Sequence, residues 1–171
     1  MLQYYWTFIA FLFVSIGISA QNIGYTFDNN ERNWTVKQGK AEIQEKGAYK
    51  EKSLKLNPGT SVSFNLKLKP SSTYKLTVWM RTESGADDLV MQINDLGKNN
   101  ISITTALAAW TKFEEVLNTS NNQSSAQLEF IFGNSQGNTN AWIDEITIEY
   151  AGNYKEVAYT GIPKAPKREI K

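Results

Sequence analysis

The segment Ala141–Tyr150 places an acidic side chain inside what reads as the last of a series of alternating β-strands. A carboxylate at such a position, here Asp144, is tolerated only where something compensates its charge. A bound cation would provide that compensation. Asp144 is therefore a candidate metal ligand.

A second set of chemically useful side chains lies on strands in the middle of the chain. Between Tyr74 and Arg81 every second residue is apolar, so Trp79 and Arg81 point to the same non-core face. A flat aromatic ring can stack on the apolar face of a sugar, while amide, carboxylate and guanidinium groups can orient its hydroxyls. The segments at 89–94 and 127–132 present amide and acidic side chains outward by the same alternation. We expect six residues to share one concave sheet: Trp79, Arg81, Gln92, Asn94, Gln127 and Glu129.

Other arrangements of the aromatic residues are compatible with the same pattern. A loop could cover Trp79, with the polar residues merely solvated, as on any half-exposed sheet. Tyr25, Tyr49 and Trp142 could instead form a site at the edge of the sheet, beside loops. Trp34 and Trp110 are expected in the core, where aromatic side chains dominate.

The inventory of catalytic groups is poor. The chain has no histidine, which removes the commonest general base, and no cysteine, which removes thiol chemistry and disulfides. Of the acidic pairs, Asp87-Asp88 lies in a turn and the adjacent Glu114-Glu115 point to opposite faces of a strand. The sequence therefore predicts that the protein is not an enzyme.

The chain of 171 residues divides into three parts. Residues 1–20 are uncharged, mostly apolar and end in Ala20, which predicts a secretory signal peptide, with an uncleaved anchor helix as the alternative. Residues 21–152 are enough for one domain, and residues 153–171 form a basic, proline-containing tail or linker. We expect a secreted, periplasmic or cell-surface protein without membrane contact once the signal is cleaved. The 18 basic and 17 acidic residues give no electrostatic case for nucleic-acid binding.

Short segments of period-two apolarity fill the middle part. The clearest is Ser61–Lys69, where apolar and polar residues alternate throughout, as in a strand with one buried face. About ten such strands, separated by Asn, Gly, Ser and Pro, predict an all-β, antiparallel two-sheet β-sandwich, or jelly roll. The expected strands are Ile23–Phe27, Ala41–Glu45, Leu54–Leu56, Ser61–Lys69, Tyr74–Arg81, Leu89–Ile93, Ile101–Thr104, Phe113–Leu117, Gln127–Phe132 and Ile143–Tyr150.

The order of several short motifs resembles a known family. These motifs are Tyr25–Asp28 followed by Trp34, Gly47–Tyr49, Ser53–Leu56, Tyr74–Arg81, Ala109–Phe113 and Trp142–Ile146. In this order and spacing they resemble the carbohydrate-binding modules of the galactose-binding-like jelly-roll group, such as CenC-type and xylanase-associated modules. The similarity covers about residues 24 to 150.

This resemblance implies a structural calcium ion (Ca2+) between the first strand and the last. Its carboxylate ligands here would be Asp28 and Asp144, completed by backbone carbonyls near Gly47 and by water. The alternative is that Asp28 caps a turn through Asn29-Asn30 and that Asp144 pairs with a lysine.

The function that the resemblance implies is non-catalytic binding of a polysaccharide or oligosaccharide, with a catalytic domain or enzyme as a further partner. A structural or protein-interaction β-sandwich on the cell surface is the alternative. Binding to a panel of glycans separates the two.

Overall fold

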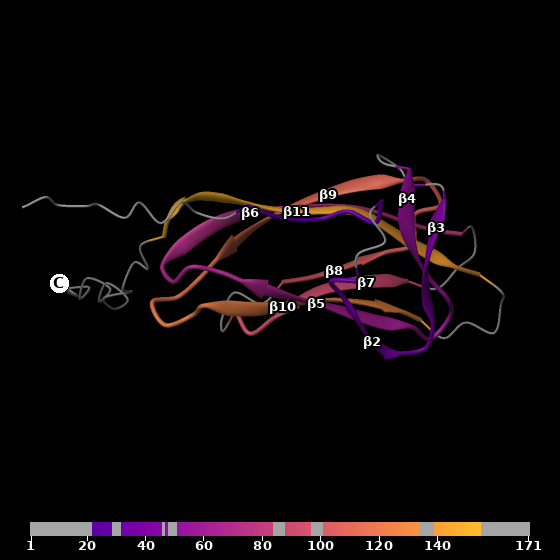
Figure 1. Ribbon diagram of the computed structural model, residues 1–171, viewed down its shortest axis with the longest axis horizontal. Coiled ribbons are helices and arrows are strands. Elements are labelled where there is room, and N and C mark those ends of the chain that lie inside the picture. Colours follow the sequence, from indigo (N-terminus) through magenta and orange to yellow (C-terminus); the bar gives the residue numbers. More distant parts are fainter. Residues whose placement is uncertain are drawn as a thin grey trace, which may run out of the picture.

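Two antiparallel β-sheets pack face to face in the computed structural model of the chain (Figure 1). The structure describes residues 22–28, 32–45, 47, 51–83, 88–96, 101–133 and 139–154. The sequence prediction of an all-β antiparallel sandwich is confirmed. The expected signal peptide, and the expected tail beyond Tyr154, lie outside the described residues.

The two sheets interleave distant parts of the chain. One is a six-stranded sheet of order β3-β4-β11-β6-β9, in which β1 also pairs with β11; it is the upper layer in Figure 1. Its strands are β1 (Ile23–Tyr25), β3 (Ala41–Glu45), β4 (Lys52–Leu56), β6 (Ser72–Thr82), β9 (Thr111–Asn118) and β11 (Ala141–Asn153). The other is a five-stranded sheet of order β2-β5-β10-β7-β8. Its strands are β2 (Thr35–Gln38), β5 (Ser61–Lys67), β7 (Leu89–Asn94), β8 (Ile101–Thr105) and β10 (Ser125–Phe132).

Alternation along each strand builds the core between the layers. On β6 the residues Tyr74, Leu76, Val78 and Met80 are buried, while the residues between them face outward. Phe64, Phe130 and other large apolar side chains of the five-stranded sheet meet them from below. Burial of one such side chain stabilises the fold by about 1.5–3 kcal/mol. The same alternation leaves an outward-facing set of residues on each sheet, and these are the candidates for function.

Strand β11 changes its partner in the middle. Ala141–Ile143 pair with β4, and Ile146–Ile148 pair with β1 on the same edge, so Asp144 and Glu145 lie where one partner gives way to the other. The pairing with β6 shifts register at the same point, and Glu145 has a φ of 35°. A non-glycine residue with positive φ in a bulge is strained by about 1–3 kcal/mol, so the surrounding pairings must hold it there.

Three details depart from the sequence prediction or refine it. Strand β2 was not expected, because all four of its residues are exposed and show no alternation. Strand β8 ends at Thr105, one residue beyond the expected end of that strand. Strand β11 continues to Asn153, one residue beyond the expected end of the module. Within the described ranges, no helix is long and apolar enough to cross a membrane.

Candidate functional site

The outer face of the five-stranded sheet gathers four of the predicted site residues. Gln92 and Asn94 on β7 lie directly opposite Glu129 and Gln127 on β10. All four side chains are partly exposed and face away from the core. We call these four residues the polar face: Gln92, Asn94, Gln127 and Glu129. The structure thus brings four of the six predicted site residues together on one face.

Hydrogen bonds fix the centre of the polar face. The Ser61 hydroxyl donates to Oε1 of Glu129 over 2.8 Å, and the Gln92 amide donates to Oε2 over 2.8 Å. The Asn94 amide reaches the same Oε2 at 3.5 Å. Hydrogen bonds to a carboxylate are about twice as strong as those between neutral groups. The orientation of Glu129, and with it of Gln92, is therefore set before any ligand arrives.

The polar face continues toward the edge strand β2. Nζ of Lys37 donates to Oε1 of Gln127 over 3.3 Å. Gln127 also lies opposite Asn65 on β5, so three amide side chains are in register across three neighbouring strands. Since adjacent strands are about 4.8 Å apart, the row from Asn65 through Gln127 to Asn94 spans roughly 10 Å.

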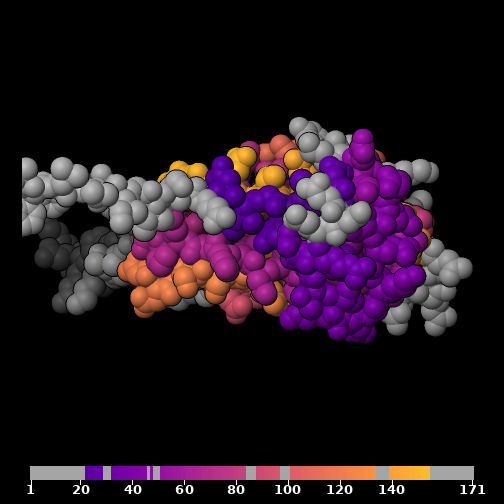
Figure 2. All heavy atoms as spheres, viewed as in Figure 1, coloured from indigo at the N-terminus to yellow at the C-terminus, as the bar shows by residue number. Residues whose placement is uncertain are grey.

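A hollow of about 440 Å³ adjoins this row where β1 passes β5. It is lined by Tyr25 together with Ile23, Asn33, Thr35, Ser63, Asn65 and Lys67. Because Ser63 and Asn65 pair with Glu129 and Gln127, the hollow and the polar face are continuous. Tyr25, one of the residues considered for an edge site, thus lies on a surface continuous with the polar face. Figure 2 shows the N-terminal segment, in indigo, lying across this side of the sandwich.

Tyr25 supplies the aromatic ring of the hollow. Its hydroxyl donates to the Asn65 carbonyl over 3.1 Å, and its ring meets Phe64 edge-on at 5.1 Å between centroids. Burial raises the pKa of the Tyr25 hydroxyl, so the group stays protonated and remains a donor. The ring is held rigidly from both ends. Tyr49, the other tyrosine considered for an edge site, lies outside the described residues.

Trp79 and Arg81 do not join the polar face, which corrects the expectation of one shared sheet. They lie on β6, between β11 and β9, and therefore on the outer face of the opposite sheet. The chain crosses from one layer to the other between the end of β5 at Lys67 and the start of β6 at Ser72. Alternation shows which residues share one face of a strand, but it does not show which sheet the strand joins.

Arg81 is held between two indoles. Its guanidinium carbon lies 4.0 Å from the ring centroid of Trp142 and 5.2 Å from that of Trp110. Nε1 of Trp142 in turn donates to Gln44 over 3.3 Å. The expectation that Trp110 belongs to the core is wrong, because it packs on this outer face. Trp34 does pack against the core. No sequence pattern indicated this stack, since Arg81 lies on β6, Trp142 on β11 and Trp110 just before β9, far apart in the chain.

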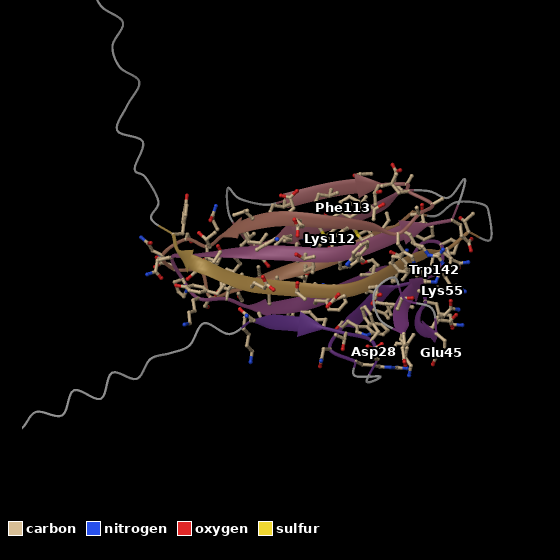
Figure 3. All side chains as sticks on the ribbon, turned by 90° about the horizontal axis from the view of Figure 1, so that it is seen from above. Asp28, Glu45, Lys55, Lys112, Phe113 and Trp142 are labelled. Carbon is tan, nitrogen blue, oxygen red and sulfur yellow. The ribbon has the colours of Figure 1, made fainter. Side chains whose placement is uncertain are left out.

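Of the two predicted metal ligands, Asp28 contacts the start of β4, and Asp144 follows Ile143, which pairs with that strand. Oδ1 of Asp28 accepts a hydrogen bond from the Lys52 amide over 3.0 Å. Asp144 is fully buried, and its Oδ1 accepts from the Glu145 amide over 2.8 Å. The next residue of β4, Ser53, is also fully buried and precedes Leu54, the partner of Ile143. Figure 3 shows Asp28 at the corner of the sheet beside Glu45, which pairs with Nζ of Lys52 at 3.6 Å.

The acidic residues considered for catalysis are separated. Glu114 accepts from Lys75 and Lys112 at 2.8 and 2.7 Å, and these contacts lower its pKa to about 2. It is therefore ionised at any pH where a glycosidase acid would work. Its neighbour Glu115 points to the other side of β9, and Asp87 lies outside the described residues.

Both the fold and the site define a β-sandwich with a polar outer face and an adjoining aromatic hollow, the class to which sugar-binding jelly rolls belong. A family profile described as "Carbohydrate binding domain" matches residues 21–141. The chain belongs to this family, and family membership indicates polysaccharide binding as its function. No curated protein matches the chain.

Solved structures with a similar fold are also carbohydrate-binding modules. The xylan-binding domain CBM22-1 of Paenibacillus barcinonensis Xyn10C has 15% identity and a TM-score of 0.58, covering 78% of this chain and 96% of that one. The CBM22-1-CBM22-2 tandem of the same protein has 15% identity and a TM-score of 0.60 over 80% of this chain; the match spans 47% of the tandem. TmCBM61 in complex with β-1,4-galactotriose has 13% identity and a TM-score of 0.55, over 73% and 94%. At these identities the likeness is one of fold.

Proposed function

We propose that the polar face and the Tyr25 hollow together bind a segment of a β-linked polysaccharide. The observation that carries this proposal is the Glu129 carboxylate, oriented by Ser61 and Gln92 beside a hollow that exposes an aromatic ring. Amides and a carboxylate accept and donate hydrogen bonds to sugar hydroxyls, and a rigid ring offers an apolar surface to a pyranose. Their fixed positions reduce the entropic cost of binding.

The geometry of this surface suits a polysaccharide of several linked sugars better than a single sugar. The amide row crosses three strands and runs into the hollow, so it can contact successive rings of one polysaccharide. Glu129 is the one acid among the four residues of the polar face, and Lys37 lies at the edge of that face, where it contacts Gln127. Neutral polysaccharides are therefore the first probes, and xylan and β-1,4-galactan are chosen because fold neighbours are described with these ligands.

Affinity electrophoresis and titration with soluble xylan and galactan test this proposal. Gln127→Ala removes the middle of the amide row and is expected to weaken binding about tenfold, the effect of losing one to two hydrogen bonds. Val116→Ala is the matched control, since Val116 is 59% exposed on the opposite sheet. Equal retardation of both variants and the wild type would exclude the polar face as the binding surface.

We also propose that the protein acts without catalysis. A glycosidase needs a second carboxylate roughly 5–9.5 Å from the first, and Glu129 is the single acid of the polar face. We expect no release of reducing ends from xylan or galactan. The predicted signal peptide supports a secreted or cell-surface location, where a catalytic partner domain or enzyme could act on the bound polysaccharide.

A calcium ion between Asp28 and Asp144 is our proposal for the N-terminal corner. The residues fit, since Asp28 contacts the start of β4, and Asp144 is a buried carboxylate between Ile143, which pairs with β4, and the strained Glu145. Among the described residues, no group of three or more Asp, Glu, His or Cys side chains is placed so that side chains alone could hold a metal ion. Calcium prefers about six to eight oxygens, so backbone carbonyls and water would complete its shell.

Thermal unfolding with calcium and with a chelator tests the ion. A site occupied at 100 times its dissociation constant stabilises the fold by about 2.7 kcal/mol, so the chelator should lower the melting temperature by several degrees. Asp28→Asn should reduce that response. Equal melting temperatures of the wild-type chain with calcium and with the chelator would contradict the proposal.

A further inference from the structure

The outer face of the six-stranded sheet has a hollow of its own. It measures about 270 Å³ and is lined by residues of β6, β9 and β11. Figure 3 looks onto this face, with Lys112 near the middle of the sheet and Trp142 toward the end that carries β3 and β4. The polar face is on the far side of the sandwich, so the two surfaces cannot contact the same stretch of ligand.

Small residues form the floor of this hollow and an indole forms one wall. Thr77 lies between Glu114 on β9 and Thr147 on β11, in register with both. Trp79 lies two residues further along β6 on the same face. Its side chain is partly exposed and lines the hollow. The short threonines beside the large indole leave room for a ring to lie on the sheet against Trp79.

Fixed ion pairs form the opposite wall. Nζ of Lys75 and Nζ of Lys112 both contact Oε1 of Glu114, at 2.8 and 2.7 Å. Glu149, opposite Lys75 on β11, also lines the hollow. Both lysines are thus engaged by acids of the sheet itself, which leaves little positive charge for an anionic ligand. A neutral, hydroxyl-rich ligand matches these walls better than a uronic acid does.

Glu145 completes the lining. Its positive φ and the register shift beside it arise where β11 changes partner from β4 to β1. That bulge re-aims the strand, and the Glu145 side chain lines the hollow from the end nearest Trp79. Bulges and strained residues concentrate at functional sites, where they direct a side chain that regular pairing would place elsewhere.

We propose that this hollow is a second saccharide subsite, which takes one neutral pyranose unit stacked on Trp79 and hydrogen-bonded to the threonine hydroxyls and Glu145. It goes beyond the function proposed above, since that function requires only the opposite face. Two sites on opposite faces make the module bivalent. It can then hold two polysaccharide chains together, and avidity on a dense wall or fibre exceeds the affinity of either face.

The test titrates the full chain with xylohexaose and β-1,4-galactotriose by calorimetry and measures light scattering with soluble xylan and galactan. The wild type should bind two oligosaccharides per chain and should cross-link the polysaccharide into larger particles. Trp79→Ala should weaken one of the two sites at least about tenfold and abolish cross-linking. The double variant Gln127→Ala, Glu129→Ala should lose the other site and also fail to cross-link.

Two further variants distinguish loss of the second site from misfolding of the chain. Trp79→Tyr keeps an aromatic wall and should retain weakened binding at the second site. Thr77→Gln fills the floor from an outward-facing position and should block the site while the melting temperature changes little.

Each outcome separates this proposal from the function proposed for the polar face. One site per chain that is lost in the Gln127, Glu129 double variant and unchanged in Trp79→Ala overturns the second subsite and retains the polar face. One site that depends on Trp79 alone overturns the polar face and retains the subsite. Absence of binding by the wild type to every probe overturns both.

Discussion

Replacement of Glu129 distinguishes a structural role of the polar face from a binding role. In Glu129→Gln, the new carbonyl can still accept from Gln92, and the new amide can donate to Ser61, whose hydroxyl is able to turn and accept. Only the charge is lost. The free energy of unfolding should therefore fall by no more than about 1 kcal/mol, a change in melting temperature below about 4 °C for a domain of this size.

Binding should respond more strongly than stability. A ligand hydroxyl that donates to the carboxylate would donate to a neutral amide oxygen instead, and the difference between charged and neutral hydrogen bonds is about 1–1.5 kcal/mol. The dissociation constant for the bound polysaccharide should rise about tenfold. Glu129→Ala removes the acceptor altogether and should lower both affinity and stability further.

Calorimetric titration and thermal unfolding of the same preparations provide the measurement. Glu51→Gln is the charge-matched control, because Glu51 is exposed and lies on neither face. If Glu129→Gln and Glu129→Ala both bind as the wild type does while only Glu129→Ala loses stability, the carboxylate is purely structural and the assignment of the polar face is refuted.

Three further changes test the packing that positions the surfaces. Arg81→Met should lose the cation–π contacts with both indoles, about 1–2 kcal/mol, and change tryptophan fluorescence; an unaltered spectrum and melting temperature would contradict the stack. Gly39→Ala should destabilise the fold by more than about 2 kcal/mol in chemical unfolding. The φ of Gly39 is +75°, and an added Cβ would lie 2.5 Å from Oγ1 of Thr60 and 2.7 Å from the Cα of Thr60. A variant as stable as the wild type would show that this turn adjusts. Glu114 has its pKa lowered to about 2 in the folded chain, so its ion pairs contribute stability above the unfolded pKa of 4.5, and that contribution is lost as pH falls from 4.5 through about 2. Glu114→Gln should flatten this part of the pH profile of the melting temperature. An unchanged profile would contradict a stabilising role of the Glu114 ion pairs.

Among the described residues, period-two apolarity predicted every strand except β2, and the apolar side of each predicted strand that packs into the core. It succeeded for the polar face because β7 and β10 are neighbours, so residues that point outward on each strand meet on one surface. It failed for β2, whose four exposed residues carry no pattern and which pairs with β5 at the edge of its sheet.

The spacing of motifs also predicted the family and two buried or partly buried acids, Asp28 and Asp144, near the ends of the domain. It could not show that Asp28 contacts Lys52 or that Asp144 follows a residue paired with β4, since these contacts join residues far apart in the chain. The same limit applies to Arg81, whose stacking partners are Trp142 on β11 and Trp110 just before β9.

Membership in a sheet is what only the tertiary structure decided. The chain alone determined that Trp79 faces away from the core, because side-chain direction along a strand is a local property of the backbone. Strand pairing is non-local, and the crossing between β5 and β6 placed Trp79 opposite the polar face instead of within it. The partner change of β11 at Glu145, and the continuity of the Tyr25 hollow with the amide row, arise from the same long-range pairing.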